Sequence, residues 1–255
     1  MFRIRKIYDD VSSANKNAIR QVQSIISRQF PSARVEDLEK IPLQLHDPVS
    51  YRYRSVLFVA DDTSGKVKGF AVMLHLADIN VTYLELISAA PSKTGGGIGG
   101  VLYERIREES LKLKVHGLFF ECSIDDPDRI SNPDVLRQNR RRMLFYERYG
   151  ALPVLNTVYD SPINPGDEDL YYIMYDALDS SRPLSRSLAQ KTVRAVLERK
   201  YHNIISPSLI DEVVESFRDD PAVLRKSRYR KHLPEVRKFS KASIGLVVNE
   251  KHSRV

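Results

Sequence analysis

The sequence is poor in cysteine and in long apolar runs, and each shortage excludes a class of protein. Cys122 is the one cysteine in 255 residues, which excludes an internal disulfide and a zinc site made of several cysteines. No uninterrupted apolar stretch approaches the roughly 20 residues that a membrane-spanning helix needs. The opening "MFRIRKIYDD" alternates in polarity and lacks the apolar core of a signal peptide. We therefore expect a cytoplasmic protein with no membrane partner.

The net charge of +7 is concentrated at one end of the chain. Residues 221–255 hold ten Lys or Arg and two Glu, whereas the preceding 220 residues hold 30 basic and 31 acidic side chains. The body shows no basic stripe with interleaved aromatic residues, which is the usual sign of a nucleic-acid surface. Nucleic acid is therefore not the expected partner.

Alternation and helical spacing predict a mixed α+β protein. The pattern at 2–8 predicts a strand, and apolar residues at helical spacing predict a helix over 13–30. The stretch around Pro42 and Pro48 predicts no regular element. Three strands with short turns between them are expected to run antiparallel, at 55–62, 67–77 and 81–90. Then a helix, a strand, a helix and two strands are expected at about 97–114, 116–122, 133–148, 151–159 and 169–178. This order predicts a mixed, mostly antiparallel sheet flanked by helices.

The rest of the chain differs in pattern. Two short amphipathic helices are expected at 185–201 and 206–220, so the domain division that we predict is 1–177, 178–220 and 221–255. The last part is a basic linker or tail that ends in a strand-like run, "SIGLVVN".

Glycine is scarce overall but concentrated at one place. Five of the eleven glycines lie at 95–100, between the apolar run "YLELISAA" and a helix-forming segment. Because glycine destabilises a helix interior by about 1 kcal/mol relative to alanine, such a cluster indicates close approach to the backbone or a positive φ. The pattern predicts a ligand against this loop.

Two known phosphate-binding patterns fit the cluster incompletely. A P-loop needs Lys and then Ser or Thr after its last glycine, but Val101 and Leu102 stand there. The dinucleotide fingerprint G-x-G-x-x-G is matched by Gly95, Gly97 and Gly100, which keeps an NAD(P)-binding oxidoreductase as an alternative. Against it, "APSKT" separates the strand from the first glycine, and the preceding strands are expected to be antiparallel.

The segment "PSKTGGGIGG" resembles the main motif of the GNAT superfamily of acetyltransferases. In that family a strand leads to an Arg or Gln, then to glycines that open a helix and hold the diphosphate of coenzyme A. The resemblance, which covers about residues 1–177, implies a GNAT-like fold with acetyl-CoA as cofactor. Backbone N–H groups at a helix N-terminus suit that anion. Thr94 stands where the family usually has Arg or Gln, a departure that Lys93 could offset.

A second segment, "NRRRMLFYERYGA", resembles the later motif of the same family. Asn139, Tyr146 and Gly150 fall on matching positions, which implies that Asn139 lies by the pantetheine arm and that Tyr146 protonates the departing thiolate. Together the two motifs imply these cofactor-binding residues: Ile87, Ser88, Ala89, Lys93, Thr94, Gly95, Gly96, Gly97, Ile98, Gly99, Gly100, Asn139, Arg142 and Tyr146.

Two carboxylates are candidates for the general base. The resemblance implies that a primary amine, on a small molecule such as a polyamine or on a lysine side chain, attacks the thioester directly, and a base must accept its proton. Glu85 is expected on one strand face with Tyr83 and Ile87, and Glu121 lies at the end of the next strand. With Tyr146 they form the predicted catalytic set. No metal site is expected. A catalytically silent acyl-CoA-binding module remains an alternative, because Thr94 lacks the usual charge.

The terminal run "IGLVVNEKH" resembles the first strand of a histone-deacetylase-like (acetylpolyamine amidohydrolase) domain. That resemblance implies a deacetylase-like partner domain. An additional edge strand on the main sheet is the alternative.

Overall fold

The computed structural model describes residues 2–29, 35–89, 97–161, 170–180, 182–201 and 204–229. Within these ranges the strands form one sheet. Its seven strands in these ranges lie in the order β1 (Arg3–Ile7), β2 (Arg54–Asp61), β3 (Val67–Leu76), β4 (Val81–Ala89), β5 (Leu118–Ser123), β7 (Tyr171–Asp176) and β6 (Leu152–Pro153). Only β4 and β5 pair in parallel among them, and the other neighbours are antiparallel. The α+β class with a mixed, mostly antiparallel sheet is confirmed.

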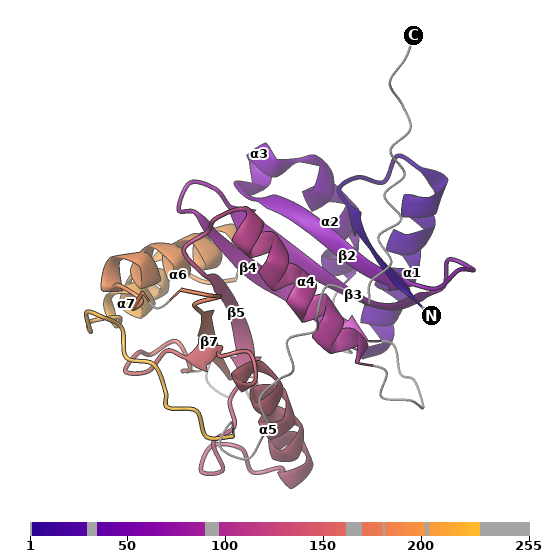
Figure 1. Cartoon of the computed structure of the whole chain (residues 1–255). Coiled ribbons are helices and arrows are strands. Elements are labelled where there is room, and N and C mark those ends of the chain that lie inside the picture. Colours follow the sequence, from indigo (N-terminus) through magenta and orange to yellow (C-terminus); the bar gives the residue numbers. More distant parts are fainter. Residues whose placement is uncertain are drawn as a thin grey trace.

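Helices cover both faces of this sheet (Figure 1). One face packs against α1 (Ser13–Gln29), α2 (Val35–His46), α6 (Arg186–Lys200) and α7 (Pro207–Glu215). The other packs against α4 (Ile98–Lys112) and α5 (Pro133–Glu147). The short α3 (Pro48–Tyr51) leads into β2. No helix within the described ranges is long and apolar enough to cross a membrane.

Helix α2 was not expected, because Pro42 lies inside it. Proline has no N–H, so it leaves the carbonyl of Leu38, four residues earlier, without its helical partner. The side-chain amide of Gln23 in α1 donates to that carbonyl at 2.9 Å. A contact from another helix thus offsets the lost hydrogen bond, which local sequence patterns do not report.

The expected strand at 151–159 is much shorter in the structure. Only β6 pairs regularly with β7, and Val154 then bridges Leu224. Asn156 takes a positive φ of 59°, and the chain leaves the sheet there. This turn carries Tyr159 toward the middle of the sheet, where its hydroxyl reaches Glu121.

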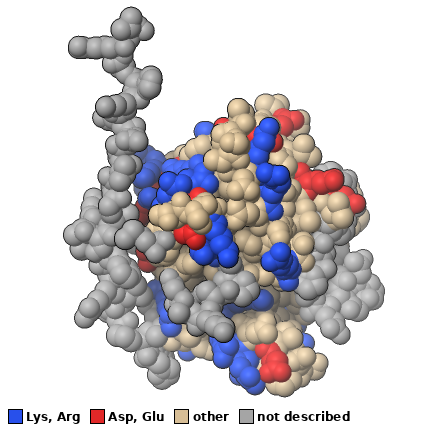
Figure 2. Space-filling model, turned by 90° about the vertical axis from the view of Figure 1, so that its right-hand side faces the viewer, with Lys and Arg blue, Asp and Glu red and all other residues tan. Residues whose placement is uncertain are grey.

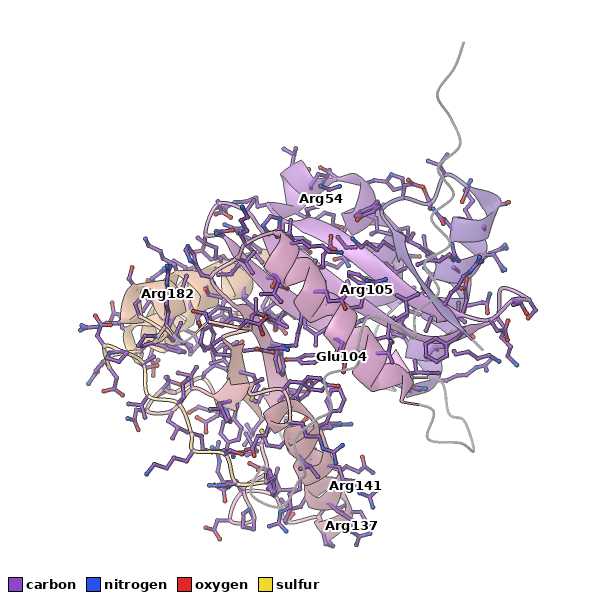
Figure 3. The ribbon with its side chains drawn as sticks, viewed as in Figure 1. Arg54, Glu104, Arg105, Arg137, Arg141 and Arg182 are labelled. Atoms are coloured by element: carbon purple, nitrogen blue, oxygen red, sulfur yellow. The ribbon has the colours of Figure 1, made fainter. Side chains whose placement is uncertain are left out.

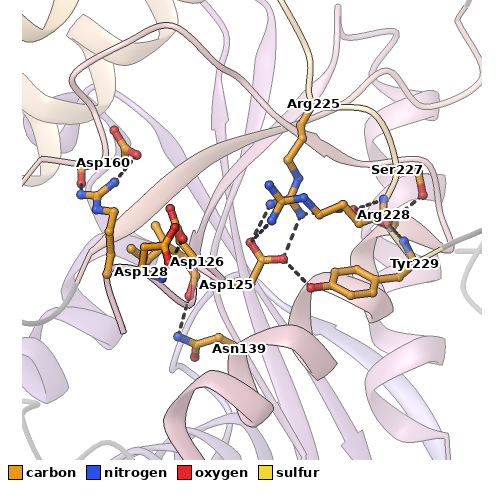
Figure 4. Close-up of polar contacts among 12 residues, drawn as sticks. Asp125, Asp126, Asp128, Asn139, Asp160, Arg225, Ser227, Arg228 and Tyr229 are labelled. Carbon is orange, nitrogen blue, oxygen red and sulfur yellow. Dashed lines mark hydrogen bonds and ion pairs between the residues drawn. The ribbon is translucent and has the colours of Figure 1, made fainter. Parts of the chain in front are cut away.

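Residues 222–229 are fastened to the body by a buried charge network (Figure 4). The Arg225 guanidinium donates to both oxygens of Asp125, at 2.6 and 3.1 Å, and to Glu147 at 3.2 Å. Tyr229 donates to Asp125, and Ser227 donates to Glu147, each at 2.7 Å. Both carboxylates have fully buried side chains. The strand-like run at the end of the tail lies outside the described residues.

One face of the molecule carries its charged side chains in separate groups (Figure 2). In the view of Figure 2, Lys and Arg side chains form several patches, with acidic and uncharged residues between them. Arg137 and Arg141 of α5 project outward into solvent (Figure 3).

We predict that Arg225→Met destabilises the protein by about 3–5 kcal/mol, because two buried carboxylates lose their cation. Urea denaturation measures the change. Arg186→Met is the matched control: its pair with Asp220 is about half exposed, so its loss should cost less than about 1 kcal/mol. Equal effects of the two substitutions would contradict a central role for the Arg225 network.

Candidate functional site

Strands β4 and β5 diverge part of the way along their length. They pair at three positions, which end at Leu84 opposite Phe120. Beyond that point β4 continues to Ala89 along β3, and β5 continues to Ser123 along β7. Over these last residues the two strands are no longer paired with each other. No other strand of the described ranges pairs with their facing edges, so the backbone N–H and C=O groups of these edges have no partner in the sheet.

A β-bulge lies at the point of divergence. Val72 of β3 pairs with Leu86, but the next residue, Met73, pairs with Leu84, so Glu85 is the extra residue on β4. A bulge changes the side-chain alternation that follows it. Leu86 packs with Tyr83 in the core on the α1/α2 side, whereas Ile87 packs in the core on the α4/α5 side. The expectation that Ile87 shares a face with Tyr83 was therefore wrong.

The N-terminus of α4 lies beside the diverging end of β4. A Cβ added at Gly69 of β3 would lie 2.7 Å from Ile98 and 2.9 Å from the Ser88 carbonyl, which shows how closely the helix start packs there. Gly97 caps the helix with a positive φ of 65°. A Cβ at Gly97 or Gly99 would meet no atom of the described residues within 4 Å. Gly97 offers no side-chain cap, so the N–H groups of the first helical turn have no intrahelical partner and no side chain at the N-cap to accept from them.

Four of the predicted cofactor-binding residues, Lys93, Thr94, Gly95 and Gly96, lie outside the described residues. Ile87, Ser88 and Ala89 end β4, and Gly97, Ile98, Gly99 and Gly100 start α4. These two groups of the predicted set lie at the same end of the sheet.

Helix α5 places the other predicted residues against β5. The buried Asn139 amide donates to the Ile124 carbonyl at 2.8 Å, and Arg142 contacts Ser123 at 3.3 Å. The ring of Tyr146 packs on Phe120, with 4.3 Å between ring centroids. Arg142 thus contacts the end of β5, whereas Arg137 and Arg141 of the same helix point outward (Figure 3). The helix ends at Glu147, and Gly150 in the turn that follows takes a positive φ of 88°.

Burial determines the protonation of the reactive groups on this side. It raises the pKa of the Tyr146 phenol, with the Cys122 side chain adding to the effect, so Tyr146 stays protonated at neutral pH. Burial also raises the pKa of the Cys122 thiol to about 12. A thiol that is not ionised is a poor nucleophile. Tyr146 can donate a hydrogen bond, and Cys122 is a core residue.

Glu121 is held by three tyrosines on the opposite face of the sheet. Tyr83 and Tyr201 donate to its Oε2 at 2.9 and 2.7 Å, and Tyr159 donates to its Oε1 at 2.7 Å. Burial, and after it the charge of Glu121, raises the pKa of each phenol well above its usual value. All three phenols therefore remain donors at neutral pH and fix the carboxylate in one position.

Glu85 lies on the same face and has cationic neighbours. The Gln44 side-chain amide donates to its Oε2 at 3.0 Å. The ammonium groups of Lys40 and Lys200 lie 3.7 and 3.8 Å from its Oε1. The Lys200 Nζ also lies over the Tyr83 ring, 4.5 Å from the centroid. Both predicted carboxylates thus belong to the α1/α2/α6 face, and Tyr146 with Asn139 belongs to the other.

Sequence reasoning missed the residues that surround these carboxylates. Lys40, Gln44, Tyr159, Lys200 and Tyr201 come from α2, from the turn after β6 and from the end of α6. None stands in a recognisable motif. The sequence offers one general indication: a buried carboxylate needs hydrogen-bond donors or cations, so some residues of the chain must surround Glu85 and Glu121. It does not indicate which residues these are. Among the described residues, no group of His, Cys, Asp and Glu could hold a metal ion.

We predict that the tyrosines around Glu121 make the folded protein less stable at alkaline pH. Their pKa is raised in the folded protein, so their contribution is complete below the unfolded value of about 10 and is lost as pH rises above it. Urea denaturation at increasing pH should show the free energy of unfolding falling above about pH 10.

The fall should be shallower in Tyr201→Phe and unchanged in Tyr8→Phe, since Tyr8 is 38% exposed. Simultaneous ionisation of all thirteen tyrosines in the native protein near pH 10 would contradict the assignment.

Comparison with known proteins gives similarity of structure only. No family model matches the chain, and no curated protein matches it in sequence. Tetrahymena GCN5 shares 15% identity over 69% of this chain and 96% of its own, with a TM-score of 0.46. Aminoglycoside 6'-acetyltransferase type Ii shares 14% sequence identity over 71% of this chain and 99% of its own, with a TM-score of 0.49. A chimera of spermidine N-acetyltransferase SpeG from Vibrio cholerae and hSSAT shares 14% sequence identity over 70% of this chain and 99% of its own, with a TM-score of 0.49. Likeness at this level assigns no activity to the chain.

Proposed function

We propose that the protein is an N-acetyltransferase that moves an acetyl group from acetyl-CoA to a primary amine. The observation that carries the proposal is the divergence of β4 and β5 directly beside the N-terminus of α4, whose N-cap Gly97 supplies no side-chain cap. An extended chain such as pantetheine can lie between the strands, and a diphosphate suits the free N–H groups of the helix. The sequence resemblance to GNAT enzymes points to the same two places.

The two faces of the sheet would serve two substrates. On the α4/α5 face, Asn139, Arg142 and Tyr146 would line the cofactor arm. On the opposite face, the acceptor amine would approach Glu85 and Glu121. The acetyl carbonyl would lie in the gap, where N–H groups of Ile87 to Ala89 on the open edge of β4 can stabilise the oxyanion.

The chemistry assigns different roles to the two carboxylates. Three phenols already donate to Glu121, so this group suits a fixed negative charge that attracts the acceptor ammonium. Glu85 accepts a hydrogen bond from Gln44 on Oε2, but the cations beside its Oε1 are beyond ordinary hydrogen-bond distance, which leaves Oε1 better placed to accept the proton of the amine. The neutral amine then attacks the carbonyl carbon and the C–S bond breaks.

Tyr146 would stabilise the departing thiolate. Its raised pKa keeps the phenol protonated but also makes it a weak acid relative to a thiol of pKa about 8.5. A hydrogen bond to the developing sulfur charge therefore suits this residue better than complete proton transfer.

The dinucleotide alternative lacks structural support. A repeated parallel βαβ unit should follow the fingerprint, but β4 and β5 are the only parallel neighbours in the described part of the sheet. We predict that isothermal titration calorimetry detects binding of acetyl-CoA but not of NAD(H) or NADP(H). The reverse result would favour the oxidoreductase.

Gly99→Ala sharpens this binding test. Its Cβ would meet no described atom within 4 Å, so the fold should tolerate it, yet the Cβ would enter the space proposed for the diphosphate. Affinity for acetyl-CoA should fall about tenfold, which corresponds to loss of one charge-assisted hydrogen bond. Unchanged affinity would argue against a diphosphate at this helix.

We predict that Tyr146→Phe lowers turnover on the order of a hundredfold and leaves affinity for acetyl-CoA nearly unchanged. Thiol release from acetyl-CoA, measured with a panel of primary amines, gives the rate. Tyr175→Phe is the control, because its hydroxyl bonds the His116 carbonyl where β5 begins, away from the divergence. Cofactor binding without thiol release from any amine would favour the silent module instead.

A further inference from the structure

Lys200 occupies the part of the site where an acceptor amine would be expected. It is the last residue of α6, and its side chain is only 9% exposed. The Nζ lies 4.5 Å from the centroid of the Tyr83 ring, 5.0 Å from that of Tyr201 and 3.8 Å from Glu85 Oε1. Aromatic faces and a carboxylate are the groups that bind a substrate ammonium.

The neighbouring Arg199 shows what an ordinary structural cation on this helix looks like. Its guanidinium makes a two-pronged pair with Asp78 and donates to the Arg52 carbonyl at 2.7 Å. Lys200 has no such hydrogen-bonded partner among the described residues, and its separation from Glu85 is longer than a hydrogen bond. Its amine is therefore held by the charge of Glu85 and by two aromatic faces and not by hydrogen bonds, beside the strand where β4 leaves β5.

We propose that the protein acetylates its own Lys200. The inference rests on the proposed function, since the acetyl donor is the acyl thioester of coenzyme A. Glu85 takes a proton from the Lys200 ammonium, and the neutral Nζ attacks the carbonyl carbon. A C–N bond forms, the C–S bond breaks, and the nitrogen gives up its second proton, which the departing thiolate takes to leave as free coenzyme A. The products are N-acetyl-lysine, the thiol and the proton on Glu85, which passes to water.

Burial makes the reaction intramolecular. A side chain that is 9% exposed and enclosed by Tyr83 and Tyr201 cannot extend into the site of a second molecule while α6 stays in place. Within one chain, its position beside the proposed thioester gives it a high effective concentration. The rate per molecule should therefore not depend on protein concentration.

Acetyl transfer would also change the charge of the acceptor site. The product side chain is neutral, so Glu85 would keep only Lys40 as a cationic neighbour. An external ammonium would then face a more negative site. Modification of Lys200 thus converts an occupied acceptor site into one that favours a cationic substrate.

The test is incubation of the purified full chain with acetyl-CoA and no other amine, followed by mass spectrometry of its peptides. We expect acetylation at Lys200 at least about tenfold faster than at Lys191, an effect of effective concentration. Lys191 lies on the same helix but is exposed, so uncatalysed chemical acetylation would favour it instead. The first-order rate should be equal over a wide range of protein concentrations, and Lys200→Arg should abolish the acetylation at this position.

Three results would overturn the inference, and they separate it from the proposed function. Faster acetylation at Lys191 than at Lys200 would show that the modification is uncatalysed. An unmodified Lys200 in a chain that binds acetyl-CoA and acetylates an external amine would refute self-acetylation and leave the proposed function intact. Failure to bind acetyl-CoA at all would remove both.

Discussion

The divergence of β4 from β5 is the constraint on which the rest of the site depends. Two paired strands separate at little cost only when each keeps its other neighbour, and here β3 holds β4 while β7 holds β5. The bulge at Glu85 lies at the same point and turns two consecutive side chains, Glu85 and Leu86, toward one face. The opening between the strands and the arrangement of charged groups beside it thus arise from one local change of register.

Buried polar groups are satisfied by long-range contacts in two separate places. On one face, Glu121 receives hydroxyl groups from residues 38 positions before it and 38 and 80 positions after it. Elsewhere, Arg225 joins Asp125 and Glu147 across 100 and 78 positions. Because an unpaired carboxylate in such surroundings is costly, the segments that supply these partners are fixed to the sheet. The end of α6 and residues 222–229 are therefore integral to the fold around the site.

Much of the architecture could be predicted from sequence, because strand alternation, helical spacing and the glycine cluster are local signals. The antiparallel order of the early strands and the helix after Gly97 follow from such patterns. The face of Ile87 could not be predicted, since a bulge depends on pairing with β3. Helix α2 was hidden by Pro42, whose cost is offset by Gln23 of another helix. Lys200 and Tyr201 approach Glu85 and Glu121 only through the packing of α6, and no local pattern encodes that contact.

The helices on the two faces of the sheet carry two separate sets of polar groups. The groups proposed to bind the cofactor come from α4 and α5, whereas those around the carboxylates come from α2, α6 and the turn that holds Tyr159. The sheet separates the two sets, and they meet only at the gap between β4 and β5. If the protein is the acetyltransferase proposed above, replacing the helices on the carboxylate face changes which acceptor binds and leaves the groups proposed for the cofactor in place. Under that proposal, acceptor selectivity and cofactor binding can change separately during evolution.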